Sequence, residues 1–242
     1  MVVAAPTRRQ VAVLAPMKPE LQPFVKAAGL ERDPAVTSGG PVYRGSVPGA
    51  DVVALMTGIG MDAATRAVTR AFELGSCDHV LVVGIAGGID PRLRIGDVVV
   101  PEVVVDGRDG AEYRSHPLGR REQSGRIVCS DDLLSGHDEQ VSLADQGVTA
   151  VDMETAAVAA VCHARGVPWT AFRGISDHGA DDGIDDSVLA LSRPDGTANM
   201  GAVARYVLTK PWRVPNLARL GRDMQRAVDA AVRASLGALA DP

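Results

Sequence analysis

The sequence predicts an α/β fold, a single-domain three-layer α/β/α arrangement around a central mixed, mostly parallel sheet. Short apolar runs of the kind that form buried strands alternate with helical patterns along the whole chain. The length of 242 residues suits one large domain, and neither an internal repeat nor a low-complexity linker divides residues 1–242. The core must be built from Val, Ala, Leu and Ile, because hydrophobic residues make up 46% of the chain but aromatic residues only 3%.

Composition and charge exclude several classes of protein. The formal net charge of −5 does not indicate a nucleic-acid-binding face. Three scattered cysteines and five scattered histidines show no metal-ligand spacing, and the odd cysteine count fits a reducing cytosol, so we expect a cytoplasmic protein without a metal site. The chain has no run of about 18 apolar residues, so we predict no membrane span. The N-terminus lacks the order of a secretory signal.

The strands are predicted by short apolar or β-branched runs that end at glycine, proline or acidic residues. A turn at Pro48-Gly49 joins the second of them to the third. In chain order the predicted strands lie at residues 11–16, 41–44, 51–56, 79–83, 98–100, 103–105, 126–129 and 169–175.

The helices are predicted by apolar residues that recur every three or four positions. Gly29 can end the first helix, and Gly166 with Pro168 ends the alanine-rich one. The predicted helices lie at residues 20–29, 61–72, 142–146, 151–165 and 216–239, the last an amphipathic helix of about six turns. We expect residues 1–9 to be loosely held and the polar segment 106–125 to form a long surface loop.

Acidic residues occur where predicted strands and helices meet. Glu20 follows the first strand, Asp152 and Glu154 begin a helix, and Asp177 ends a strand. Because ligands of open α/β sheets bind outside the carboxyl ends of strands, these carboxylates could perform acid–base work or bind hydroxyl groups. Helix capping or dipole compensation is the simpler role, which we favour for Asp152 and leave open for Glu20 and Glu154.

Two glycine-containing turns and one acidic segment add weaker signals. Gly58-Ile59-Gly60 precedes a helix, and residues 84–88 hold four small residues, so the backbone could approach a ligand closely at both places. The first turn lacks the third glycine of a dinucleotide fingerprint, and a plain tight turn explains it. Four aspartates within residues 181–186 predict a solvated loop more than a metal site.

Five segments taken together resemble the nucleoside phosphorylase/nucleosidase superfamily, and within it the 5′-methylthioadenosine/S-adenosylhomocysteine nucleosidases. They occur in the family's order and cover about residues 11–190. They are Ala15-Pro16-Met17-Lys18-Pro19-Glu20, Gly58-Ile59-Gly60, Gly84-Ile85-Ala86-Gly87-Gly88 with Gly96-Asp97, Val151-Asp152-Met153-Glu154, and Ile175-Ser176-Asp177.

The resemblance implies a purine nucleosidase of nucleoside phosphorylase-like fold that needs neither metal nor cofactor. Asp177 matches the acid that protonates the purine at N7, and Glu20 matches the glutamate that orients the attacking water. Glu154 matches the glutamate that binds the ribose hydroxyls, with Met153 against the sugar. The other substrate-binding positions that the resemblance implies are Met17, Ile59, Gly87, Leu133 and Leu134.

Hydrolysis is favoured over phosphorolysis by two departures from the phosphorylases of the superfamily. Those enzymes commonly carry an arginine before the glycine-rich segment, where this chain has Val82-Val83. Their Gly-Asp-Pro-type loop is replaced by Ala15-Pro16-Met17. A phosphate dianion would therefore be poorly compensated, although Arg173 lies close enough to Asp177 to serve an anion.

The 5′ substituent of the nucleoside stays open. Ile85 and Leu133 replace the small hydroxyl residue and the aromatic residue usual in methylthioadenosine nucleosidases, and the tail beyond residue 194 is longer. That tail resembles the hopanoid-associated branch, whose suggested substrate is adenosylhopane, and futalosine hydrolases are a further alternative. A non-catalytic nucleoside-binding protein is disfavoured because all three acids are present. Relatives are dimers or hexamers, so we expect a homo-oligomer, with a dimer favoured.

Overall fold

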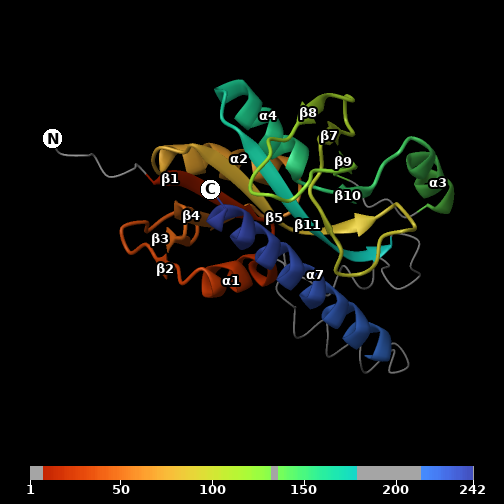
Figure 1. The fold of residues 1–242 in the computed structure, drawn as a ribbon, viewed down its shortest axis with the longest axis horizontal. Helices are drawn as coiled ribbons and strands as arrows, with labels where there is room; N and C mark the ends of the chain where they lie inside the picture. The colour runs from red at the N-terminus through yellow and green to blue at the C-terminus, as the bar shows by residue number, and fades with distance from the viewer. Residues whose placement is uncertain (1–7, 132–135, 179–213, 242) are drawn as a thin grey trace.

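A single sheet with helices on both faces forms the protein (Figure 1). The computed structural model describes residues 8–131, 136–178 and 214–241. Its strands are β1 (Arg9–Ala15), β2 (Glu31–Arg32), β3 (Val42–Val47), β4 (Ala50–Met56), β5 (His79–Gly88), β6 (Val98–Val99), β7 (Val103–Asp106), β8 (Glu112–Arg114), β9 (Arg126–Cys129), β10 (Ala150–Asp152) and β11 (Trp169–His178). Its helices are α1 (Lys18–Ala27), α2 (Met61–Glu73), α3 (His137–Asp145), α4 (Thr155–Arg165) and α7 (Val214–Ala240).

The sheet has two parallel parts that meet at β5. Strands β4, β1, β5 and β11 are parallel to one another, as are β10, β9 and β7. Antiparallel pairs occur at the margins, for example β3 with β4 and β7 with β8, and where β10 meets β5. The predicted fold class, a mixed sheet with a parallel centre, is confirmed.

Strand β5 has an opening along one of its edges. Strand β11 pairs with one edge over nearly the whole of β5. On the other edge β1 pairs as far as Val82 and β10 begins at Gly87. No described strand pairs with that edge between these two points, so its backbone is available to side chains from elsewhere.

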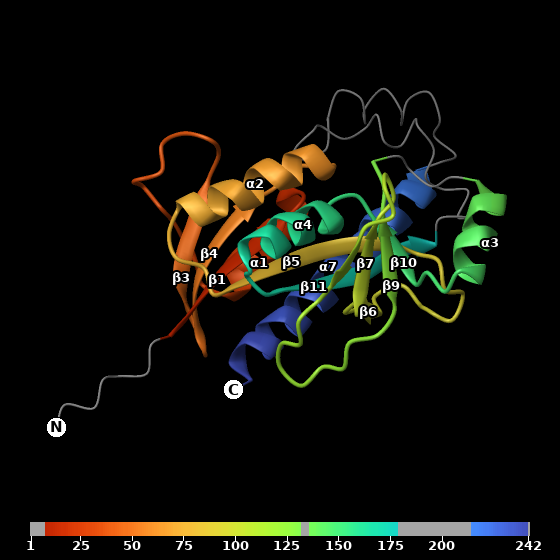
Figure 2. The same ribbon diagram turned by 90° about the horizontal axis from the view of Figure 1, so that it is seen from above.

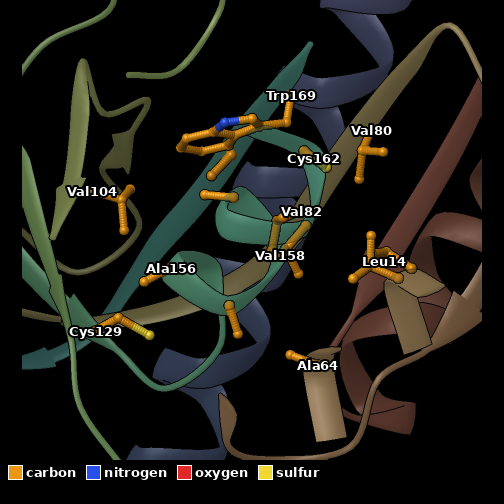
Figure 3. Close-up of a cluster of buried hydrophobic side chains, with 14 of the residues drawn as sticks. Leu14, Ala64, Val80, Val82, Val104, Cys129, Ala156, Val158, Cys162 and Trp169 are labelled. Carbon is orange, nitrogen blue, oxygen red and sulfur yellow. The ribbon is translucent and has the colours of Figure 1, made fainter. Parts of the chain in front are cut away.

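Helices α1 and α7 cover one face of the sheet, and α2 and α4 cover the other (Figures 1 and 2). On the second face, Leu14, Val80 and Val82 of the sheet pack against Ala64 and Val158 of the helices (Figure 3). On the first face α7 lies directly against β11, because a Cβ atom at Gly174 of β11 would lie 2.1 Å from the Ala227 carbonyl oxygen of α7. A side chain at that position would push α7 off the strand that carries the site.

Several elements differ from the prediction in extent. Strand β5 continues through the glycine-rich run to Gly88, and β11 continues through Asp177 to His178, since the two pair along this stretch. Residues Ala150–Asp152 form β10, whereas the sequence suggested that a helix begins there. Strand β8 lies within the segment predicted as a loop, and α3 begins five residues before the predicted helix.

The C-terminal helix of the prediction is present as α7. Its apolar face packs on β11 and β5, with Ala227, Val228 and Ala231 buried. None of the helices in the described ranges is long and apolar enough to cross a membrane.

Candidate functional site

The candidate site lies at the opening in the edge of β5. Glu20 reaches it from the first turn of α1, and Glu154 reaches it from the junction of β10 and α4. Arg173 and Asp177 belong to β11, which pairs with the opposite edge of β5. The fold thus brings together four charged side chains that lie up to 157 residues apart in the sequence.

Glu20 links the start of α1 to the open edge of β5. Its Oε2 atom accepts a hydrogen bond of 2.8 Å from the Met17 N–H, which caps the helix, and its Oε1 atom accepts one of 2.9 Å from the Ile85 N–H. The side chain is 1% exposed. Burial raises the pKa of Glu20 to about 8, against the opposing effect of Arg173, and Glu154 adds to the rise. Glu20 is therefore a carboxyl group that exchanges its proton close to neutral pH.

Gly84 separates Glu20 from Arg173. A Cβ atom at this position would lie 2.4 Å from Glu20 Oε1 and 2.6 Å from Arg173 Nη1. Both distances are shorter than real contacts of a Cβ atom, so any side chain here would displace one of the two charged groups. The absence of a side chain keeps a carboxylate oxygen and a guanidinium nitrogen next to the same small space.

Arg173 is fully buried and held in place by a polar network at the junction of β10 and α4. Its Nε atom lies 2.8 Å from Asp152 Oδ2, and its Nη2 atom donates to Glu154 Oε2 at 3.1 Å and to Thr155 Oγ1 at 2.9 Å. Burial lowers the pKa of the guanidinium, but Asp152, Glu154 and Glu20 raise it by more, so Arg173 stays charged. Its buried Nη1 atom has no hydrogen-bond partner among the described residues. A buried cationic donor without a partner is costly, which indicates a place for a bound water or substrate oxygen.

Asp152 has the structural role that the sequence favoured. Its Oδ1 atom accepts a hydrogen bond of 3.2 Å from the Thr155 N–H at the start of α4, and its Oδ2 atom accepts from the Thr155 hydroxyl. The same carboxylate pairs with Arg173. Asp152 thus fixes the helix start and the guanidinium together.

Glu154 joins three parts of the site. Its Oε1 atom accepts a hydrogen bond of 3.1 Å from the Gly60 N–H, and its Oε2 atom accepts from Arg173. Burial raises the pKa of Glu154, with Arg173 opposing the rise and Asp152 adding to it. Glu154 precedes the first residue of α4, whereas the sequence placed it inside the first turn.

Asp177 lies where β11 departs from regular pairing. The register between β11 and β5 shifts between Ile175 and Asp177, and Asp177 is then opposite Gly87. The Ser176 hydroxyl donates to Asp177 Oδ2 at 2.6 Å, and a Cβ atom at Gly87 would lie 3.3 Å from Asp177 Oδ1. The hydroxyl fixes one carboxyl oxygen, and the missing side chain of Gly87 lets the other approach strand β5.

The remaining predicted positions are placed only in part. Ile59 is 42% exposed between two glycines of positive φ, and Met17 and Met153 flank the chain segments that carry Glu20 and Glu154. Leu133, Leu134 and the aspartates of residues 181–186 lie outside the described residues.

The sequence did not assign several residues of the network. Arg173 was noted only as a possible anion ligand, although an arginine inside an apolar strand is itself a signal of a buried ion pair. Thr155 and Asp131 gave no signal, because their roles depend on contacts with distant segments. Asp131 Oδ1 accepts a hydrogen bond of 3.0 Å from the Met61 N–H at the start of α2. No group of three possible metal-binding side chains occurs in the described part of the chain.

The raised pKa of Glu20 predicts a pH-dependent stability. The unfolded chain loses this proton near pH 4.5, and the folded protein keeps it to about pH 8, so the folded state binds more protons between these values. The free energy of unfolding should fall as the pH rises through this window, by about 1.4 kcal/mol at most for each unit of raised pKa. Glu20→Gln removes the ionisation and should make the protein more stable than wild type at pH 9 but not at pH 5.

Urea denaturation at the two pH values measures this difference, and Glu73→Gln at the exposed end of α2 is the matched control. If wild type and Glu20→Gln keep a constant difference in stability between pH 5 and pH 9, Glu20 does not have a raised pKa.

Comparison with known proteins identifies the class first. The family model of the phosphorylase superfamily matches residues 10–118 and 109–209, and the chain belongs to this superfamily. The resemblance inferred from the sequence motifs is confirmed.

The relatives to which the chain is similar within this superfamily are nucleosidases. A 5′-methylthioadenosine/S-adenosylhomocysteine nucleosidase of Actinobacillus succinogenes is 33% identical over 167 residues, which is 57% of this chain and 73% of that protein. One of Tolumonas auensis is 28% identical over 198 residues, covering 69% of this chain and 86% of that protein.

Solved structures share the fold at lower identity. The S-adenosylhomocysteine nucleosidase of Streptococcus pyogenes aligns with a TM-score of 0.73 at 21% identity, over 98% of both chains. The futalosine hydrolase of Helicobacter pylori aligns with a TM-score of 0.67 at 18% identity, over 93% of this chain and 94% of that one.

Proposed function

We propose that the protein is a purine nucleosidase that hydrolyses the N-glycosidic bond of a 5′-substituted adenosine to adenine and the free sugar. The observation that carries the proposal is the pair formed by Glu20 Oε1 and Arg173 Nη1 beside the space over Gly84. A water molecule there could donate a proton to the carboxylate while its oxygen accepts from the guanidinium. The similarity to the curated nucleosidases supports the same activity and a nucleoside substrate.

The attack requires a base whose pKa lies near the working pH, and Glu20 fulfils this condition. In its ionised form it takes the proton of the attacking water as the oxygen adds to the anomeric carbon. Its negative charge also stabilises the oxocarbenium character that the sugar develops. Arg173 holds the water oxygen and, because Asp152 and Glu154 compensate its charge, adds little net positive charge beside that cation.

We propose that Asp177 protonates the departing base. Protonation of the purine at N7 removes the negative charge that the base would otherwise carry as the bond breaks. The Ser176 hydroxyl donates to Asp177 Oδ2, and Oδ1 lies beside Gly87, which has no side chain. This arrangement supports presentation of one carboxyl oxygen to a base lying against β5.

We assign the ribose hydroxyls to Glu154. Each of its oxygens accepts one hydrogen bond from the protein and retains the capacity to accept another. Met17, Ile59 and Met153 are proposed to contact the sugar and the 5′ substituent. Partial exposure of Ile59 fits a 5′ pocket that a second copy of the chain completes, in line with the expected homo-oligomer.

The first property to test is whether the rate of adenine release is independent of phosphate. Glu20, Asp152 and Glu154 surround the single guanidinium of Arg173, so a phosphate dianion would meet excess negative charge. We expect adenine release at the same rate with and without phosphate, and a free or 5′-substituted ribose as the sugar product. Mass spectrometry of the sugar and an adenine assay with a panel of 5′-substituted adenosines measure both points.

A pentose 1-phosphate whose rate of formation rises with phosphate would establish a phosphorylase instead. Within the panel, faster hydrolysis of methylthioadenosine or S-adenosylhomocysteine than of futalosine or adenosylhopane would support the favoured substrate class. The likeness to the futalosine hydrolase structure concerns the fold alone, so the panel decides between them.

A further inference from the structure

A cavity of about 590 Å³ lies on the α7 side of the sheet, apart from the residues of the candidate site. We call its floor the lining residues Leu93, Gly96, Asp97 and Val98, which follow β5 and reach the first residue of β6. Arg121 from the segment before β9 and Arg233 from the second half of α7 also line it. Three segments that are distant in sequence therefore contribute to one concave surface.

The cations around this cavity exceed the anions. Arg121 donates only a long hydrogen bond of 3.3 Å to the Val98 carbonyl oxygen, and Arg233 has no hydrogen bond or ion pair with any residue the structure describes. The stem of Arg226 packs against the cavity floor, since a Cβ atom at Gly96 would lie 3.0 Å from its Cγ and Cδ atoms. Among the described residues that line the cavity, Asp97 is the one carboxylate, and it already interacts with the Arg94 N–H at 2.9 Å and with the Arg94 guanidinium at 3.7 Å.

Two guanidinium groups that line one cavity without a carboxylate partner among the described residues match an anion with several oxygen atoms, because paired N–H groups fit phosphate. The excess is local, since the whole chain carries a net charge of −5. We propose that this cavity, lined by Arg121 and Arg233, binds a phosphate-bearing small molecule. The site is independent of the hydrolytic reaction, which needs no phosphate.

The cavity floor is hydrogen-bonded to β11, the strand that carries the candidate acid Asp177. The Gly96 N–H donates to the Ile175 carbonyl oxygen, and the Ile175 N–H donates to the Asp97 carbonyl oxygen, each at 2.9 Å. Ile175 lies two residues before Asp177, at the start of the register shift. A ligand that orders residues 93–98 should therefore also suppress opening of these two hydrogen bonds.

The experiment uses pyrophosphate as the probe and calorimetry of the full chain saturated with adenine, so that the candidate active site is already filled. We expect binding to the wild type, and a Kd about tenfold weaker or more in Arg233→Ala and in Arg121→Ala, the loss typical of one charge-assisted contact. Arg66→Ala, at an exposed arginine of α2 on the opposite face of the sheet, should bind as wild type does. Amide exchange at Gly96 and Ile175 should slow when pyrophosphate is present.

The proposal is overturned if pyrophosphate produces no heat, or if both cavity variants bind it as wild type does. If pyrophosphate binds the chain without adenine but not the chain saturated with adenine, the proposal is also overturned, because the anion then occupies the nucleoside site. Binding to vesicles containing phosphatidylserine that pyrophosphate does not compete away would show a lipid surface instead. None of these results alters the test of hydrolysis, which measures adenine release in phosphate-free buffer.

Discussion

Asp177→Asn should lower the rate of adenine release by about 10²–10⁴-fold while the protein stays folded. The amide has the shape of the carboxyl group and can keep the contact with the Ser176 hydroxyl, but it has no proton to give to the purine. Without that proton the base would leave as an anion. Steady-state assays with 5′-methylthioadenosine measure the loss, which should appear in kcat more than in KM because protonation occurs in the transition state.

The control for this variant is Asp145→Asn on the exposed face of α3, which makes the same chemical change far from the site. It should retain wild-type activity. A folded Asp177→Asn protein with near-normal turnover would show that another group protonates the base. A substrate whose leaving group needs no proton should lose less in this variant than 5′-methylthioadenosine does, and this comparison separates the acid role from a positioning role.

Glu20→Gln should abolish hydrolysis but retain nucleoside binding. The glutamine can keep only part of the two backbone hydrogen bonds from Met17 and Ile85, and it cannot accept a proton from the attacking water. The base and the ribose are proposed to contact Asp177 and Glu154, which the substitution leaves in place. Calorimetry with 5′-methylthioadenosine should therefore give a measurable Kd on a protein that releases no adenine over hours.

Two measurements distinguish a loss of the chemical step from a folding defect. Circular dichroism should be unchanged, and the exposed Glu73→Gln should have normal activity. If Glu20→Gln is folded but binds no nucleoside, Glu20 serves the structure of the site and not the chemical step. If it hydrolyses at a normal rate, the water is activated elsewhere.

The local patterns of the chain were enough to predict most elements. Runs such as 126–129 and 51–56 contain the β-branched and apolar residues of a buried strand, and the structure has β9 and β4 there. Two of the boundaries that failed are set by a distant partner. Strand β5 extends through four small residues because β11 pairs with it, and β10 exists because β9 and β5 accept it on either side.

The candidate acids were predictable for a similar reason. Glu20, Glu154 and Asp177 stand at junctions between elements, and the order of five short motifs identified the superfamily, which the family model confirms. Their separate roles stay proposals that the variants above test.

By itself, the sequence determined the class of fold and the superfamily and predicted the three candidate acids, because these depend on local periodicity and on short motifs in a fixed order. Only the tertiary structure decided how the charges are balanced. The buried Arg173 pairs with Asp152 and Glu154, its Nη1 atom has no hydrogen-bond partner in the described part of the chain, and the missing side chain of Gly84 lets this atom and Glu20 approach the same point. The physical reason is that desolvation and charge interactions act through space: the pKa of Glu20 is raised first by its burial in the folded protein and then by Glu154, which is distant in the chain.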